Sequence, residues 1–381
     1  MHGRTGTASL PRARSLVLAA LAIALLCTLV VGGTPLIGGI RPPTNFGLPC
    51  MPLPRREGTP VLGLRFERAL SAMVTSAPFA TGSRIVVATT SGRLIAVDAR
   101  DGTTMWHVSL GSGVDVDLAG DAGQVIVAAR DGVLRSFAIS DGRPLWSTDL
   151  GTTLGPPTVA GRDVLIASTT RGAYRLDASS GRQAWHIDTG AGMIGAPTVD
   201  SGTVFLAGLD GSVDAVSIDK GNETGHFDAR GSVEASAAVG ADLLVAVTRD
   251  GKARAFDRRT GDATWTARTD RDLPLYGTPA IAGGLVAAGS SDCAVHAFDA
   301  STGKERWTYG ALGPIDTTIV TITGKAIFCV ASDDGTLSLL DRDGTPVARS
   351  QPYSPLTSPV AGAGYLAVGT EDGRLLVFDT P

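Results

Sequence analysis

A unit of about forty residues recurs along most of this chain, and it constrains the fold more than any other feature. Seven copies share a turn glycine, at Gly92, Gly132, Gly172, Gly211, Gly251, Gly335 and Gly373. One further copy has Asp292-Cys293 in that place, and the intervals between successive turns are 40, 40, 39, 40, 42, 42 and 38 residues. Internal periods of this length are typical of repeat architectures such as propellers and solenoids.

All the tryptophans fall at one phase of the unit, four residues after a second recurring glycine. They are Trp106, Trp146, Trp185, Trp265 and Trp307. A flat indole at this place can pack between neighbouring units and donate its N–H to a backbone carbonyl. Phe66 stands at the same phase near the N-terminus, whereas Gly225 and Ala348 replace the ring in two copies. We therefore expect aromatic docking between most units and looser joints at Gly225 and Ala348.

Each unit has the pattern of four short strands. In the third copy these are residues 157–160, 163–168, 173–177 and 184–187, rich in Val, Ile, Leu and Ala. Pairs such as Ser180-Gly181 separate the runs, because tight turns need a positive φ that glycine adopts without a Cβ clash. The second strands are almost continuously apolar, as expected for strands that are covered on both faces.

The two ends of the repeat region complement each other. The last copy stops just after its third strand, and residues 62–70 resemble the missing fourth strand. Pairing these segments would close a ring and remove two exposed sheet edges. The sequence therefore predicts an all-β fold, an eight-bladed β-propeller of four-stranded blades at residues 58–381, closed by the N-terminal strand.

The N-terminal region has the pattern of a membrane-targeting segment. Arg4, Arg12 and Arg14 precede residues 15–40, which carry no charge, and about 20 apolar residues suffice to cross a bilayer. We expect a cytoplasmic basic tail at 1–14, a transmembrane signal anchor (one helix) at 15–40 and a proline-rich linker at 41–57. The propeller would then lie on the extracytoplasmic side of the cell membrane. Cleavage of the segment, which would give a secreted protein, and lipidation at Cys27 are the alternatives.

The charge balance argues against one class of partner. The chain has 33 Lys+Arg and 37 Asp+Glu, and the first 41 residues hold four arginines and no acid, so the rest carries a formal charge of −8. Binding of duplex nucleic acid requires a basic footprint, and we therefore expect no nucleic-acid partner. We expect the propeller to be a monomer.

The pattern G-x-L-x-A-x-D-x-x-x-G-x-x-x-W runs from Gly92 to Trp106, and its later part recurs from Val295 to Trp307. It resembles the PQQ-like propeller repeat. That family includes quinoprotein dehydrogenases and BamB-type proteins, which help to assemble outer-membrane β-barrels. The resemblance implies the propeller fold and two functions: a non-catalytic scaffold that binds proteins in the cell envelope, or alternatively a propeller that binds PQQ or another small ligand.

The residues favour the scaffold over the enzyme. Quinoprotein relatives carry a vicinal cysteine pair and a Ca²⁺ ion held by Glu, Asn and Asp, and this sequence has no Cys-Cys pair. The recurring aspartates are expected to accept backbone N–H bonds in turns; they are Asp98, Asp177, Asp257, Asp299, Asp341 and Asp379. His107, His186 and His226 belong to different blades and are expected to face solvent. We therefore expect no catalytic residue, cofactor or metal, and an envelope or membrane protein as partner.

The connections from the fourth strand of one unit to the first strand of the next gather on one face of a propeller. Candidate partner-binding residues in them are Leu154, Met193, Ile194, Leu275, Tyr276, Ile315 and Leu356. Apolar side chains on loops held by a rigid scaffold often mark a docking surface. The alternative is that these loops fold inward and plug the central channel.

Two cysteines fall in neighbouring blades. Cys293 lies in a turn of the sixth blade and Cys329 at the end of a strand in the seventh. Outside the cytoplasm a disulfide between them is plausible. Two buried free thiols are the alternative, and Cys50 is a third candidate for pairing.

Overall fold

The computed structural model describes Cys50 and residues 58–170, 172–269, 272–322, 328–351 and 353–380. The chain divides into two units, residues 1–40 and 41–381. The predicted tail, membrane anchor and linker lie outside the described residues, apart from Cys50. Within the described part of the chain, no helix is long and apolar enough to span a bilayer.

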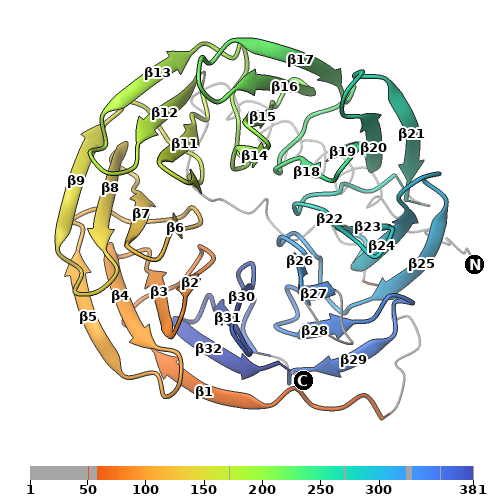
Figure 1. Cartoon of the computed structure of the whole chain (residues 1–381). Coiled ribbons are helices and arrows are strands. Elements are labelled where there is room, and N and C mark those ends of the chain that lie inside the picture. The colour runs from red at the N-terminus through yellow and green to blue at the C-terminus, as the bar shows by residue number, and fades with distance from the viewer. Residues whose placement is uncertain are drawn as a thin grey trace, which may run out of the picture. The chain divides into compact units, whose positions relative to one another are not determined.

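Eight four-stranded antiparallel sheets are arranged around a common axis, with the first strand of each innermost and the fourth at the rim (Figure 1). The prediction of an eight-bladed propeller is confirmed. Blades 1 and 2 consist of β2 (Phe79–Thr81), β3 (Arg84–Ala88), β4 (Arg93–Asp98) and β5 (Thr104–Ser109), then β6 (Ala119–Gly120), β7 (Gln124–Ala128), β8 (Val133–Ala138) and β9 (Pro144–Asp149). Blades 3 and 4 consist of β10 (Thr158–Ala160), β11 (Asp163–Ala167), β12 (Ala173–Asp177) and β13 (Gln183–Ile187), then β14 (Thr198–Asp200), β15 (Thr203–Ala207), β16 (Ser212–Ser217) and β17 (Glu223–Asp228).

The remaining four blades follow the same order. Blades 5 and 6 consist of β18 (Ala238–Val239), β19 (Leu243–Val247), β20 (Lys252–Asp257) and β21 (Ala263–Arg268), then β22 (Ala280–Ala282), β23 (Leu285–Gly289), β24 (Ala294–Asp299) and β25 (Glu305–Gly310). Blade 7 consists of β26 (Val320–Thr321), β27 (Phe328–Ala331), β28 (Leu337–Leu340) and β29 (Pro346–Arg349). Blade 8 combines β30 (Val360–Gly362), β31 (Tyr365–Gly369) and β32 (Arg374–Asp379) with β1 (Leu64–Ala69).

Blade 8 joins the two ends of the propeller, as the sequence predicts. β1 pairs antiparallel with β32, placing Phe66 opposite Val377 and Ala69 opposite Arg374. The ring therefore closes through hydrogen bonds between segments more than 300 residues apart, and the edge of β32 is covered.

The second strands are apolar throughout because both of their faces are covered. In β3, Val86 and Ala88 pack in a cluster with residues of blade 2, whereas Ile85 and Val87 pack with residues of blade 8. Successive side chains of a strand point to opposite faces, so a blade between two neighbours needs apolar residues at every position. The core is thus a set of clusters between blades.

The tryptophans dock each blade onto the next one. The indole N–H groups of Trp106, Trp146 and Trp185 donate to carbonyl oxygens of the following blade at 3.0, 2.8 and 2.8 Å. Those of Trp265 and Trp307 do the same at 2.9 and 2.8 Å. Each ring also lies against a turn glycine of that blade, and so does the ring of Phe66, against Gly102. A side chain on those glycines would collide with the ring.

The two joints without tryptophan are filled by other side chains. At the joint between blades 7 and 8, Leu62 is buried in the same cluster as Ala348. At the joint between blades 4 and 5, the ring of Phe227 packs edge-on against Phe256, 5.6 Å between centroids. Phe227 lies two residues after Gly225, whereas Leu62 comes from the segment before β1, at the other end of the propeller sequence from Ala348.

Candidate docking surfaces on the propeller

Most of the predicted docking residues are buried, and the prediction that they contact a partner is wrong for these five: Leu154, Met193, Leu275, Ile315 and Leu356. They belong to a set of eight apolar residues, one at the entry to each blade, completed by Val74, Val114 and Val233. The N–H of Met193 donates to the carbonyl of Ser168 in the preceding blade at 3.0 Å, and Ile315 bonds Ser290 in the same way. These side chains fill the joints between blades, so they line neither an exposed surface nor a plug.

The other two candidates remain at the surface. Ile194 is 45% exposed, and Tyr276 is half-buried, with its pKa raised by that burial. Met73 and Leu312, which are not among the predicted docking residues, lie in equivalent connections and are 46% and 44% exposed. Three large apolar side chains are therefore exposed on the face formed by the connections between blades.

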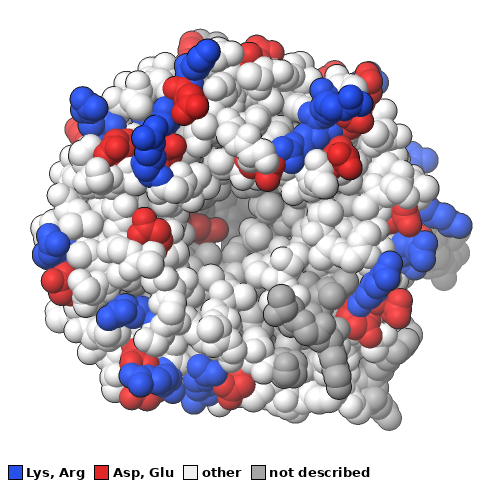
Figure 2. Space-filling model, viewed as in Figure 1, with Lys and Arg blue, Asp and Glu red and all other residues white. Residues whose placement is uncertain are grey.

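Charged side chains of both signs alternate around the rim of the face shown in Figure 2. Across the described part of the chain, many charged side chains form ion pairs with close neighbours, such as Asp98 with Arg100 at 2.6 Å and Asp131 with Arg135 at 2.6 Å. Because such pairs neutralise each other locally, this face has no extended field of one sign in the described part of the chain.

The recurring aspartates accept hydrogen bonds in turns. Arg100 donates to Asp98 from its side chain and its backbone N–H, which lowers the pKa of Asp98 to about 2. Ser179 and Ser180 donate to Asp177 and lower its pKa to about 2 as well. Their role is to fix turn geometry.

The described residues do not fit the Glu, Asn and Asp set that holds Ca²⁺ in a quinoprotein, because their single asparagine, Asn222, is exposed just before β17. Among the described residues, no three His, Cys, Asp or Glu side chains converge on a point that could hold a metal ion. Asp115 pairs with Arg130, and Asp117 accepts the backbone N–H of Ala77 at 2.6 Å. We therefore derive no quinone chemistry from this arrangement.

The three histidines at one repeat phase lie in separate blades and have separate surroundings. His186 stacks on Tyr174, 4.3 Å between ring centroids, and His226 bonds Asp214 at 2.7 Å. A fourth histidine, His296 of β24, is buried between two carboxylates and was not predicted from the sequence. The available signal was the i, i+4 spacing of Asp292 and His296, which brings them within reach across the turn into β24.

The disulfide joins Cys50 to Cys293, and the predicted bond between Cys293 and Cys329 is wrong. Cys329 is fully buried in the cluster between blades 7 and 8, away from blade 6, and burial raises the pKa of its thiol. Cys293 replaces a turn glycine and keeps its left-handed backbone, with φ of 70°. The bond ties the segment before the propeller to the turn between β23 and β24.

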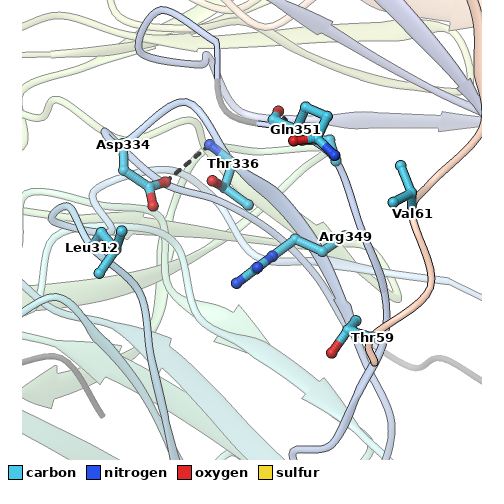
Figure 3. Close-up of a pocket in the computed structure, with 8 residues that line it drawn as sticks. Thr59, Val61, Leu312, Asp334, Thr336, Arg349 and Gln351 are labelled. Carbon is cyan, nitrogen blue, oxygen red and sulfur yellow. Dashed lines mark hydrogen bonds between the residues drawn. The ribbon is translucent and has the colours of Figure 1, made fainter. Parts of the chain in front are cut away.

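A pocket of about 300 Å³ lies in the outer groove of blade 7 (Figure 3). The guanidinium of Arg349 extends from β29 into it, towards the side on which Leu312 and Asp334 lie. Asp334 accepts the backbone N–H of Thr336 at 2.9 Å. Val61 forms a parallel bridge with Arg349, so the segment leading into β1 makes one wall.

Comparison with solved structures shows the same fold in proteins of different function. BamB from Moraxella catarrhalis is 22% identical, with a TM-score of 0.70 over 84% of this chain and 98% of that chain. The computationally designed protein Ika8 is 18% identical, with a TM-score of 0.74 over 85% and 100%. Quinohemoprotein alcohol dehydrogenase from Comamonas testosteroni is 15% identical, with a TM-score of 0.69 over 84% and 76%. Identities this low establish the fold alone.

Comparison with curated protein sequences gave no significant match. A family model described as outer membrane protein assembly factor BamB matches residues 54–156, 130–273 and 249–380. These overlapping matches together cover all eight blades. The chain therefore belongs to the BamB family of PQQ-like propellers.

Proposed function

We propose that this chain is a non-catalytic scaffold, anchored in the cell membrane, that binds a protein partner on the extracytoplasmic side. The observation that carries the proposal is the BamB family match, which extends from residue 54 to residue 380. Almost all of the described residues in that range belong to blades and their short connections, and none of these residues forms an inserted segment that could shape a substrate site.

Two features support a location outside the cytoplasm. Residues 15–40 carry no charge and follow a basic tail, which is the pattern of an anchor whose C-terminal side is exported. The disulfide between Cys50 and Cys293 suits an oxidising compartment, because thiols are kept reduced in the cytosol.

The face formed by the connections between blades is the proposed docking face for an envelope or membrane protein. Met73, Ile194 and Leu312 expose apolar side chains there, in blades 1, 4 and 7. The loops that carry them are held by buried neighbours such as Val74 and Met193, so the apolar side chains are presented on a rigid support. A preorganised surface loses little conformational entropy on binding.

Crosslinking in the native membrane tests this function. The triple variant Met73→Ser, Ile194→Ser, Leu312→Ser should lose the crosslinked partner and keep the thermal unfolding midpoint of the unaltered protein. The matched control is Met105→Ser with Leu145→Ser, which removes exposed apolar side chains from the rim strands β5 and β9. Equal capture by the triple variant and the unaltered protein would contradict the docking face, and no crosslinked partner at all would contradict the scaffold.

Binding of PQQ or another small ligand is the alternative function of this family. The described residues present no ligand set for the accompanying cation, so the scaffold is the better supported function. The absorption spectrum of protein mixed with PQQ and Ca²⁺ separates the two, because a band of bound quinone that survives gel filtration would support the alternative.

A further inference from the structure

A groove of about 630 Å³ separates the outer strands of blades 8 and 1. These strands, β1 and β5, follow one another along the rim of the ring (Figure 1). The groove lies beside the joint at which Phe66 packs against Gly102, and its lining includes Arg68, Arg93 and His107. Three cationic or protonatable side chains thus gather in one groove of a propeller whose own charge is negative.

None of these three side chains has a carboxylate partner among the described residues. The guanidinium of Arg68 donates to the carbonyl of Gly102 at 2.6 Å and to Oγ1 of Thr104 at 2.5 Å. The guanidinium of Arg93 donates to Oγ of Ser71 at 3.0 Å. Since a guanidinium has five N–H donors, both arginines are held in place and keep donors for a ligand.

In several other blades, a basic side chain of the third strand is paired with an aspartate in the turn before that strand, and Lys252 of blade 5 and Arg374 of blade 8 stand at the position of Arg93. Asp131 pairs with Arg135 at 2.6 Å in blade 2, and Asp250 pairs with Lys252 at 2.5 Å in blade 5. The same place holds Asp292, paired with His296 in blade 6, and Asp372, paired with Arg374 in blade 8.

Blade 1 has Ser91 in place of this aspartate. Its hydroxyl lies 3.0 Å from Oγ1 of Thr89, as the aspartates of blades 5 and 8 bond Thr248 and Thr370. This turn therefore has the same side-chain bond as the turns of blades 5 and 8 but lacks their carboxylate. The missing carboxylate leaves Arg93 available to an external anion.

We propose that this groove binds an acidic segment of a protein partner through its carboxylate groups. This inference rests on the proposed scaffold function and adds the chemistry of the partner. Arginine guanidinium forms bidentate, charge-assisted hydrogen bonds with carboxylates. The volume lies in the range of about 300–1,000 Å³ that is typical of ligand sites. Leu70 and Ile95 add apolar side chains to the lining, which suits a peptide better than a small inorganic anion.

Isothermal titration calorimetry on the purified full-length protein tests the groove. The probe is a hexapeptide of alternating glutamate and leucine, and the comparison is the same peptide with glutamine. Ser91→Asp supplies the missing turn carboxylate without removing any groove side chain, and Arg93→Gln removes one cation. We expect each variant to weaken binding of the glutamate peptide about tenfold, the effect of losing one hydrogen bond to a charged group. Higher salt should weaken binding by the unaltered protein.

The matched control is Arg349→Gln, which removes a cation from the blade 7 pocket and should leave the affinity unchanged. Equal binding of the glutamine and glutamate peptides would overturn the proposal, and so would unchanged binding by a folded Ser91→Asp variant. Binding of inorganic phosphate without binding of the peptide would overturn the assignment to an acidic segment. Native-membrane crosslinking separates the two hypotheses, because equal partner capture by Ser91→Asp and unaltered protein rejects the groove and leaves the scaffold standing.

Discussion

The indole N–H of Trp106 donates to the carbonyl oxygen of Ile139, at 3.0 Å, and thereby joins blade 1 to blade 2. The same ring covers Gly142, where an added Cβ would lie 2.6 Å from the indole. One side chain therefore provides both apolar contact and a directed bond across the joint. The same arrangement recurs at the four other joints that carry a tryptophan.

Removing this ring should destabilise the propeller strongly. Trp106 is only 8% exposed, so Trp106→Ala leaves a cavity in the joint and an unpaired carbonyl. We expect a loss of about 3–5 kcal/mol in the free energy of unfolding, measured with urea, and a smaller loss for Trp106→Phe, which keeps most of the apolar contact. Loss of less than 1 kcal/mol in Trp106→Ala would show that the joint does not depend on the ring.

The joint without an indole between blades 7 and 8 depends on Leu62 instead. Leu62 is 4% exposed and packs in the cluster that contains Ala348, whereas Leu64, two residues on, is 43% exposed. Leu62→Ala should therefore lower the free energy of unfolding by about 2–5 kcal/mol, and Leu64→Ala, as the matched control, by less than about 0.5 kcal/mol. Equal effects of the two substitutions in urea unfolding would contradict this assignment.

The fold could be predicted from the sequence because its signals are local and repeated. Turn glycines, apolar strands and the phase of Trp106 each occur in several copies, and they agree with one another. Blade closure was predictable for the same reason, since residues 62–70 match a strand that the last copy lacks.

The surface could not be predicted in the same way. An apolar residue in a connection can face solvent, as Ile194 does, or enter the neighbouring joint, as Met193 does, and the sequence pattern is the same for both. Whether Cys329 can reach Cys293 depends on which face of β27 carries its side chain. All residues of β27 are apolar and buried, so no alternation of polar and apolar residues in the sequence reveals that face. The significance of Ser91 requires the positions of Arg93 and Arg68 across two blades.

The disulfide and the backbone at Cys293 make separate contributions, which can be measured separately. Under reducing conditions, Cys293→Gly should be more stable than Cys293→Ala by about 1 kcal/mol, because φ of 70° suits glycine and strains alanine. Urea unfolding of both variants with reductant measures the difference. Equal stabilities would show that this turn relaxes when the side chain changes.

Peptide mapping checks the pairing itself. Digestion without reductant should release one peptide pair that contains Cys50 and Cys293. Cys329 should react with an alkylating reagent only after unfolding, because its thiol is buried and burial raises its pKa. Alkylation of Cys50 in the folded, oxidised protein would contradict the bond.

The free energy of unfolding should depend on pH through the protonation of His296 in blade 6. Its Nε2 lies 2.9 Å from Asp292 and its Nδ1 lies 2.8 Å from Glu305. Burial of the imidazole opposes protonation, but the bonds to these carboxylates outweigh it and raise the pKa of His296 above 6.5. Because the pKa of His296 is higher in the folded protein than in the unfolded chain, its protonation stabilises the fold. This stabilisation is fully present below pH 6.5, the pKa in the unfolded chain, and is lost as pH rises through the pKa in the folded protein.

Asp292 sets the lower end of the pH range in which this pair stabilises the protein. Burial acts to raise the pKa of Asp292, but the hydrogen bond to His296 outweighs burial and lowers this pKa below 3.8. Its contribution is present above pH 3.8 and is lost as pH falls through the folded value. His296→Gln should therefore destabilise the protein most between about pH 3.8 and 6.5, and the difference from the unaltered protein should shrink at higher pH. The ring of His296 also stacks on that of Phe298, 6.3 Å between centroids. Urea unfolding over this pH range measures the difference, and a difference that stays constant with pH would mean that His296 contributes by this packing alone.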